Sequence, residues 1–343
     1  MKKVLPLMIA IILLSSIALG ACSQAPAEEE GLTPVEFRLN WTLYGEHAPF
    51  FVGVDKGFYE EEGLDVSIVE GSGSSTTVKL IGNGTNNIGY ADSATMMRGV
   101  TAGVPAEAVA VTFQSSPMSF IYRQDAARPT TIDELPGSTV AITAGDASLS
   151  IFEACLGANG MSMEDVTLIQ VSNPQAKETA VLEGKADTFL GYFVDQPLRM
   201  EKVTGVDMGW SKLVDVCNVN TLSSAIIVNK FWAEDNKDII EKFVRASQRA
   251  WAYTEENPEE AAEIFAAHAE AFDAPLALAE IEGSLTLMHT PNSEGKPIGW
   301  SAHEDWVATQ QVLEEYASFN PEEDVTVFYS NDYISEPPYL PGE

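Results

Sequence analysis

Three side chains that can hold a small molecule are spaced three residues apart: Trp41, Tyr44 and His47. They follow an apolar run that we expect to be a strand, and ligands of open α/β sheets bind where strands end. The indole and the phenol offer flat faces for stacking, worth about 0.5–1.5 kcal/mol beyond area burial. Two alternatives stay open: Trp41 covers the core, and His47 bonds the backbone of its own loop.

Serine hydroxyls gather where helices are expected to begin. Ser72, Ser74 and Ser75 lie just before or at the start of one expected helix, and Ser148 precedes another. Free backbone N–H groups at a helix N-terminus, together with hydroxyls, can hold an anion or a polar edge. Ordinary N-capping uses the same residues and is the simpler interpretation.

Further candidates follow other expected strands. Tyr90 and Asp92 end one strand, Phe113 ends another, and Tyr192 and Asp195 follow a third. Aromatic rings beside a carboxylate suit a flat group that carries an N–H donor or a cationic centre. The alternative for Asp195 is a solvated surface carboxylate. We predict that all these residues line one ligand site.

Signals for catalysis are missing from the sequence. It contains no GxSxG, GxxxxGK[ST], GxGxxG or HExxH pattern, and its four histidines lack metal-ligand spacing. No CxxC pair or Cys/His cluster suggests zinc. We therefore expect a binding protein rather than an enzyme, with no catalytic residue, no metal and no cofactor.

Strand and helix patterns alternate along the chain, which predicts an α/β protein with mainly parallel sheets. Trp251 lies on the apolar face of one expected helix and is predicted to be core. Strands are expected over 35–39, 64–70, 88–91, 109–113, 120–123, 139–143, 166–171, 186–191 and 223–228. Helices are expected over 49–57, 78–81, 93–102, 149–158, 173–183, 237–254, 258–268 and 304–319.

The N-terminus predicts export and lipidation. Lys2 and Lys3 precede an apolar segment too short to span a bilayer, and Leu19-Gly20-Ala21-Cys22 matches a bacterial lipobox. Residues 1–21 are then a signal peptide, and 22–33 are the acylated Cys22 with a polar tether. An ordinary signal peptide is the alternative. The remaining length favours two lobes with a double crossover, 34–123 plus 222–335 and 124–221.

Charge excludes one class of partner. The chain has 19 basic and 51 acidic residues, a formal net charge of −32. Nucleic-acid binding needs clustered Lys and Arg, so we expect no nucleic-acid partner. Two cysteines besides Cys22 are present, Cys155 and Cys217. An exported location permits a disulfide between them, and two buried thiols are the alternative.

Several short motifs, in order, resemble the solute-binding receptors of bacterial ABC importers, in the family that includes sulfonate, taurine, nitrate and thiamine-pyrimidine binders. The matching segments are Leu39-Asn40-Trp41 with His47-Ala48, Gly57-Phe58-Tyr59, Glu62-Gly63-Leu64-Asp65-Val66, Gly89-Tyr90-Ala91-Asp92, Asp133-Glu134-Leu135-Pro136-Gly137, Asn257-Pro258-Glu259-Glu260-Ala261 and Tyr329-Ser330-Asn331-Asp332-Tyr333. The resemblance covers nearly all of the chain after the tether.

That resemblance implies a type II periplasmic-binding fold, a small solute held between two α/β lobes, and permease and ATPase partners. Together with the lipobox, we expect a monomer that is lipid-anchored on the outer side of the cytoplasmic membrane. In the thiamine-pyrimidine branch a Trp like Trp41 stacks on the ring, and an acid at a position like Asp195 pairs with its substituents. Leu43 and Tyr44 stand where that branch has Pro-Asn. An organosulfonate, taurine or nitrate-like anion is the alternative solute, and an enzyme on the same scaffold is the alternative class.

Overall fold

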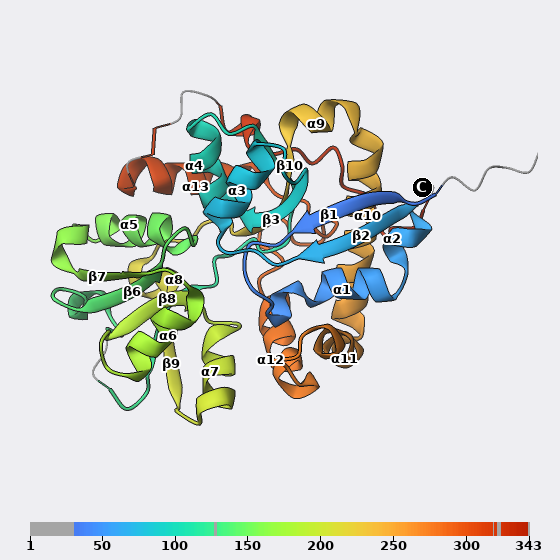
Figure 1. Cartoon of the computed structure of the whole chain (residues 1–343). Helices are drawn as coiled ribbons and strands as arrows, with labels where there is room; N and C mark the ends of the chain where they lie inside the picture. The colour runs from blue at the N-terminus through green and yellow to red at the C-terminus, as the bar shows by residue number, and fades with distance from the viewer. Residues whose placement is uncertain (1–30, 127–128, 318, 321–323, 342–343) are drawn as a thin grey trace, which may run out of the picture. The chain divides into compact units, whose positions relative to one another are not determined.

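Two five-stranded sheets organise the protein (Figure 1). The computed structural model describes residues 31–126, 129–317, 319–320 and 324–341. Cys22, the predicted lipidation site, the signal peptide and nearly all of the tether lie outside the described residues. No helix among the described residues is both long enough and apolar enough to cross a membrane.

The first sheet has the strand order β2-β1-β3-β10-β4. β1 pairs in parallel with β2 and β3, whereas β10 runs antiparallel to β3 and β4. Phe37 on β1 packs against Phe50 and Phe243, which come from two helices on the same face of the sheet. The strands are β1 (Thr33–Arg38), β2 (Leu64–Val69), β3 (Ile88–Asp92), β4 (Ala106–Val111) and β10 (Ser224–Asn229).

The second sheet repeats this pattern with the order β7-β6-β8-β5-β9. β6 is parallel to β7 and β8, and β5 is antiparallel to β8 and β9. Its strands are β5 (Met118–Arg123), β6 (Thr139–Thr143), β7 (Thr167–Val171), β8 (Thr188–Tyr192) and β9 (Met208–Lys212). We call the elements around the first sheet the first lobe and those around the second sheet the second lobe.

Helices pack around both sheets (Figure 1). Those of the second lobe are α5 (Ser148–Ala158), α6 (Pro174–Leu182), α7 (Gln196–Thr204) and α8 (Leu213–Cys217). The others are α1 (Ala48–Asp55), α2 (Phe58–Glu61), α3 (Ser74–Gly82), α4 (Ser93–Thr101), α9 (Lys230–Asp235), α10 (Lys237–Glu256), α11 (Pro258–His268), α12 (Ala274–Leu285) and α13 (His303–Tyr316). Trp251 on α10 is 1% exposed, so its prediction as core is confirmed.

The chain passes between the sheets twice, from β4 to β5 and from β9 and α8 back to β10. This matches the double crossover of the predicted fold. The boundary between the lobes differs from the prediction. Residues 118–123 were expected in the first lobe, but they form β5, which pairs in the second sheet. An apolar run predicts a strand but not the sheet that it joins, since pairing depends on distant residues.

The predicted elements occur within a few residues of their expected bounds, but several elements were missed. They include α7, β9 and α12. The helix α12 has Asp273 as its N-cap, which accepts a hydrogen bond from the Leu276 N–H, and a proline in its first turn. Its Ala-rich sequence has weak hydrophobic periodicity, which is why the pattern did not predict it.

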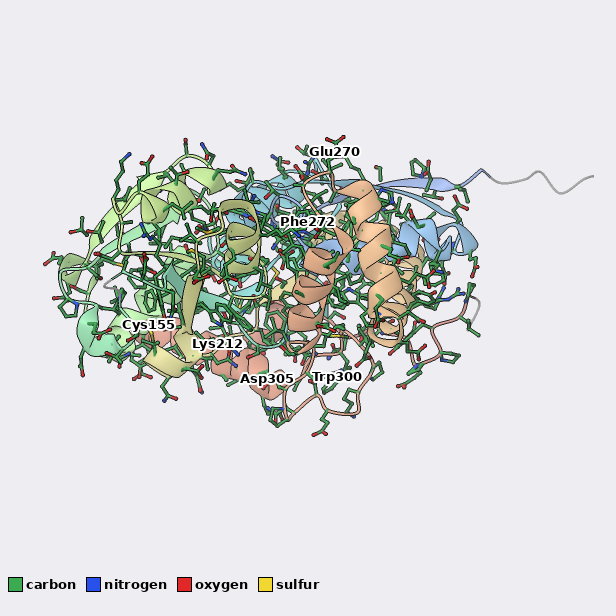
Figure 2. The ribbon with its side chains drawn as sticks, turned by 90° about the horizontal axis from the view of Figure 1, so that it is seen from below. Cys155, Lys212, Glu270, Phe272, Trp300 and Asp305 are labelled. Carbon is green, nitrogen blue, oxygen red and sulfur yellow. A yellow bond between two sulfur atoms is a disulfide. The ribbon has the colours of Figure 1, made fainter. Side chains whose placement is uncertain are left out.

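Cys155 and Cys217 form a disulfide that joins α5 to α8 within the second lobe (Figure 2). Their Cα atoms are 5.1 Å apart. The side-chain amide of Asn159 donates to the carbonyl oxygens of both cysteines, which fixes the end of α5 beside the bridge. The sequence left a disulfide and two free thiols open, and the structure has the disulfide.

Candidate functional site

A cavity of about 40 Å³ lies between the two lobes. The first lobe supplies loop residues that follow β1 and the first residue of α3. The second lobe supplies residues from the ends of β6 and β8 and from α6 and α7. The polar and aromatic lining consists of Asn40, Trp41, Glu46 and Ser74 from the first lobe and Asp146, Ser148, Lys177, Tyr192, Asp195 and Gln196 from the second.

Backbone hydrogen bonds fix the loop that carries Trp41. The N–H of Gly71 donates to the carbonyl of Trp41, and the N–H of Gly73 donates to the carbonyl of Asn40. A Cβ at position 71 would lie 2.1 Å from the carbonyl oxygen of Leu39, so only glycine allows this approach. The indole is therefore presented at the cavity by a rigid loop and is 8% exposed.

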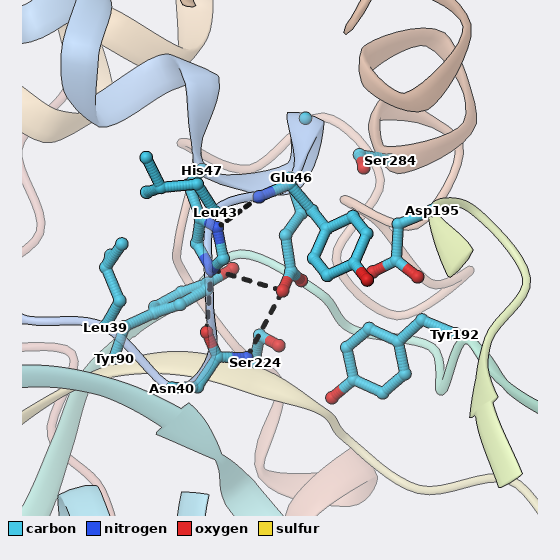
Figure 3. A network of polar contacts seen from close by, with 12 residues as sticks. Leu39, Asn40, Leu43, Glu46, His47, Tyr90, Tyr192, Asp195, Ser224 and Ser284 are labelled. Atoms are coloured by element: carbon cyan, nitrogen blue, oxygen red, sulfur yellow. Dashed lines mark hydrogen bonds and ion pairs between the residues drawn. The ribbon is translucent and has the colours of Figure 1, made fainter. Parts of the chain in front are cut away.

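His47 organises this loop through contacts with Asn40 and Glu46 (Figure 3). Its Nδ1 accepts the Tyr44 backbone N–H at 3.2 Å, so the ring proton is on Nε2, which donates to Asn40 Oδ1 at 2.8 Å. The Asn40 amide in turn donates to Glu46 Oε1 at 3.4 Å, and His47 Nε2 lies 3.2 Å from the same oxygen. His47 is fully buried and both its nitrogens are used, which fits the loop-bonding alternative.

Asp195 faces Glu46 across the cavity (Figure 3). Asp195 caps α7 by accepting the Gln196 N–H. Burial, and then the charge of Glu46, raise the pKa of the Asp195 carboxyl well above its usual value. Tyr192 shares a hydrogen bond of 3.3 Å with the Ser223 hydroxyl, which places its ring at the cavity wall.

Lys177 is the cation of the lining. Its ammonium donates to the Leu190 carbonyl at 2.7 Å and lies 3.4 Å from Asp146 Oδ2. The Ser148 hydroxyl donates to the other oxygen of Asp146, so this carboxylate is held by its own loop. The same ammonium lies 5.2 Å from the centre of the Trp41 ring, in the other lobe.

Five of the twelve ligand contacts predicted from the sequence line the cavity: Trp41, Ser74, Ser148, Tyr192 and Asp195. The structure places the other seven elsewhere. Ser72 is exposed, and Ser75 uses its backbone N–H to bond the Gly145 carbonyl of the second lobe at 3.2 Å. Tyr44 and His47 are buried beside the cavity rather than in its lining.

Tyr90, Asp92 and Phe113 belong to the interior of the first lobe. The Tyr90 hydroxyl bonds Thr112 at 2.6 Å, and the Phe113 ring packs edge-on against Trp251. Asp92 is the N-cap of α4 and accepts from the Thr95 N–H and hydroxyl. Successive side chains of a strand point to opposite faces, so the position of a residue at a strand end does not by itself aim it at the cleft.

Sequence reasoning missed five polar residues of the lining: Asn40, Glu46, Asp146, Lys177 and Gln196. Asn40 and Glu46 lie in the loop that was singled out, and Gln196 follows Asp195, so nearness in sequence was an available signal. Lys177 lies within α6, where a lysine ordinarily faces water. No sequence signal distinguishes it.

Three buried polar atoms of the lining have no hydrogen-bond partner among the described residues: Trp41 Nε1, Glu46 Oε2 and Gln196 Oε1. An unpaired buried polar group costs about 1–3 kcal/mol, so buried groups are normally paired. One donor and two acceptors beside an aromatic ring can recognise a flat solute that offers N–H donors and one acceptor. No group of His, Cys, Asp and Glu among the described residues is arranged to hold a metal ion.

A family model described as "NMT1/THI5 like" matches residues 45–261. Two bacterial binding proteins are similar along almost their whole length. The riboflavin-binding protein RibY of Chloroflexus aurantiacus is 24% identical and covers 92% of this chain and 90% of its own. The formylaminopyrimidine-binding protein of Halalkalibacterium halodurans is 24% identical, with 91% and 97% covered.

Enzymes occur among the relatives as well. The 4-amino-5-hydroxymethyl-2-methylpyrimidine phosphate synthase THI13 of Saccharomyces cerevisiae is 22% identical and covers 88% of each chain. Similarity of the sequence therefore extends to both binding proteins and synthases.

Solved structures confirm the predicted fold class. The aliphatic sulphonate binding protein SsuA of Escherichia coli has a TM-score of 0.64 at 16% identity and covers 83% of this chain and 92% of its own. The Candida albicans CA3427 gene product has a TM-score of 0.66 at 13% identity, with 89% and 98% covered, and is described as having the generic periplasmic binding protein fold.

Proposed function

The chain belongs to the NMT1/THI5-like family, and we propose that it is the extracytoplasmic substrate-binding component of an ABC importer. It captures a small aromatic or heterocyclic nutrient, similar to the pyrimidine of thiamine, between its two lobes. The relatives named as riboflavin- and formylaminopyrimidine-binding proteins support this class of solute.

The observation that carries the proposal is the set of unpaired atoms around Trp41. Trp41 Nε1, Glu46 Oε2 and Gln196 Oε1 line one cavity, and all three residues are less than one tenth exposed. A flat heterocycle would stack on the indole and donate to the two oxygens, and an acceptor substituent that extends past the edge of the indole would take its in-plane N–H. Such a ligand would satisfy groups that are otherwise costly to bury.

The charge of the lining disfavours an anionic solute. Glu46, Asp146 and Asp195 face a single cation, Lys177, whose ammonium already bonds Asp146. The Ser74 hydroxyl accepts the Asp92 N–H at 3.1 Å, so one of its lone pairs is occupied from within the lobe. A sulfonate or nitrate would bring negative charge to carboxylates without a cluster of free donors.

Binding of unlabelled solutes by calorimetry, after a thermal-shift screen, tests this function. The panel contains formylaminopyrimidine, 4-amino-5-hydroxymethyl-2-methylpyrimidine, riboflavin, taurine and nitrate. We expect stoichiometric binding of at least one heterocycle and none of the anions. Binding of taurine or nitrate alone would replace the heterocycle with the anion as the solute class.

An enzyme on the same scaffold is the second candidate, because fungal relatives are named as pyrimidine phosphate synthases. Mass spectrometry of a solute incubated with the protein separates the two. A receptor returns the solute unchanged at one equivalent, whereas an enzyme converts it in excess over protein.

We also propose how the receptor is anchored, which proteins it works with and that it acts as a single copy. Cys22 is the acylated residue, a permease and an ATPase are the partners, and the receptor is a monomer. Cys22→Ala should move the protein from the membrane fraction to the soluble fraction of the envelope, which immunoblotting of fractionated cells measures. Retention of the variant on the membrane would exclude acylation at Cys22 as the anchor.

A further inference from the structure

Lys177 is buried to an extent that is unusual for its type. It is 2% exposed, although lysine is almost never fully buried unless it is paired. Two groups hold its ammonium, the Leu190 carbonyl at 2.7 Å and Asp146 Oδ2 at 3.4 Å. Both belong to the second lobe, as does α6, which carries Lys177.

The ammonium of Lys177 also reaches the first lobe. It lies over the Trp41 ring, 5.2 Å from the ring centre, within the range of a cation–π interaction. It therefore lies on the aromatic face on which we propose that the solute stacks. Lys177 and Trp41 line the same cavity, so the contact is part of the site rather than behind it.

A stacked ring and this ammonium cannot occupy the same face together. Carbon atoms in contact approach to about 3.5–4.0 Å, so a ring stacked on Trp41 fills the space just above the indole. A group on the far side of that ring would lie about 7–8 Å from Trp41, by the same contact distance counted twice. At 5.2 Å the Lys177 ammonium is inside that limit and must move when the ring enters.

The charges of the lining residues indicate which kind of solute can replace the Lys177 ammonium. Glu46, Asp146 and Asp195 surround a cavity in which Lys177 is the only cation among the described lining residues. When its ammonium leaves the indole face, the Asp195 carboxyl loses a neighbouring positive charge. A solute that brings a positive charge of its own restores the balance, and a neutral ring does not.

We propose that Lys177 is a specificity-determining residue whose ammonium occupies the Trp41 face and is displaced by a flat ring with a delocalised positive charge. This rests on the proposed function, since it names the charge of the solute that the same cavity takes. The Lys177 ammonium takes the place of the solute on the indole. Its displacement costs free energy, which a positively charged ring offsets by its attraction to the carboxylates and a neutral ring does not.

Nuclear magnetic resonance of the solute-free wild-type protein tests the occupancy directly. The Lys177 methylene protons next to the ammonium lie near an indole face, so their resonance should be shifted upfield by the ring current. The resonance is assigned by its loss in Lys177→Met, and it should move downfield in Trp41→Ala, where only the Phe189 ring, 5.4 Å from the same ammonium, still shifts it. Absence of an upfield-shifted lysine resonance in the wild type would overturn the proposal.

Calorimetry with an isosteric pair of probes, benzamidinium and benzamide, tests the selection of charge. Lys177→Met removes the resident cation and should tighten benzamidinium binding at least tenfold; benzamide, which then has no ammonium to displace, should also bind more tightly, but by a smaller factor. Lys177→Arg keeps the charge and should stay close to wild type. Lys185→Met is the matched control, because Lys185 belongs to the same lobe and is 70% exposed.

Three outcomes of this experiment would overturn the proposal. In the first, Lys177→Met binds benzamidinium more weakly than the wild type does. In the second, benzamidinium binds the wild type but leaves the lysine resonance in place. In the third, neither the wild type nor Lys177→Met binds benzamidinium. If pyrimidines or riboflavin bind the wild type in those cases, the receptor function stands and only the role of Lys177 fails. If no heterocycle of the solute panel binds either, the proposed function fails as well.

Discussion

Arg199 of the second lobe donates from its Nε to the phenol oxygen of Tyr44 in the first lobe, at 3.2 Å. The Tyr44 hydroxyl in turn donates to Glu178 Oε1 at 3.3 Å, and Arg199 pairs with Glu178 Oε2 at 2.6 Å. These three residues bridge the lobes beside the cavity, on the side of a second, more open groove that Tyr44 and Arg199 line. The bridge must break before the lobes can separate.

Tyr44→Phe should speed solute release several-fold. The variant keeps the ring, which packs edge-on against Phe272, and removes only the hydroxyl of the bridge. A hydrogen bond contributes about 0.5–1.5 kcal/mol, or more when a charged group takes part, which sets the size of the effect. Stopped-flow fluorescence measures the dissociation rate.

Tyr59→Phe is the control for Tyr44→Phe, because the Tyr59 hydroxyl bonds Ser247 inside the first lobe at 3.0 Å. Tyr59→Phe should lower the free energy of unfolding by about as much as Tyr44→Phe does, and it should leave the rate of solute release unchanged. Equal release rates for wild type and Tyr44→Phe would show that the bridge does not hold the lobes together.

Trp41→Ala should weaken solute binding at least tenfold, which corresponds to about 1.4 kcal/mol. The indole lines the cavity at 8% exposure, so its loss removes the stacking surface rather than the centre of the core. Titration calorimetry measures the affinity, and the melting temperature shows that the variant is folded. An unchanged affinity would remove Trp41 from the site.

Asp92 should make the protein less stable as the pH rises from about 4 to about 6. Burial raises the pKa of its carboxyl to about 6 in the folded state, against about 3.9 in an unfolded chain. Between these values the folded state binds the extra proton, so the free energy of unfolding falls with increasing pH and is level above the folded-state pKa.

The size of this loss is about 3 kcal/mol, from two pKa units at about 1.4 kcal/mol each. Asp92→Asn cannot titrate and retains an N-cap oxygen for α4. Urea unfolding at pH 4 and pH 7 should therefore show a smaller drop for the variant than for the wild type. Parallel pH profiles would mean that Asp92 titrates as it does in an unfolded chain.

Loss of the Cys155–Cys217 disulfide should lower the free energy of unfolding by about 2–5 kcal/mol. The bridge closes a loop with a sequence separation of 62 and lies within the second lobe. We expect the double variant Cys155→Ser/Cys217→Ser to melt earlier and to match the wild type under reducing conditions. A melting temperature that neither change affects would contradict a formed disulfide.

The sequence by itself determined the elements and the class of fold. Alternating apolar runs and turn residues fix strands and helices locally, because side-chain periodicity follows from backbone geometry. They predicted the positions of nine strands, the α/β architecture and the double crossover, but they placed the strand β5 in the first lobe although it pairs in the second sheet. Of the three residues that suggested a site in the loop from Trp41 to His47, Trp41 lines the cavity, whereas Tyr44 and His47 are buried beside it.

Only the tertiary structure decided which residues of these elements meet. Lys177 comes from the middle of a helix, and its contact with Trp41 spans 136 positions of the sequence, so no local pattern could reveal it. Tyr90, Asp92 and Phe113 follow strands as expected, yet they face the interior of the first lobe. The direction of a side chain at a strand end depends on strand register and on packing by distant helices. A contact between the two lobes depends on how both sheets are folded, and no local stretch of sequence contains that information.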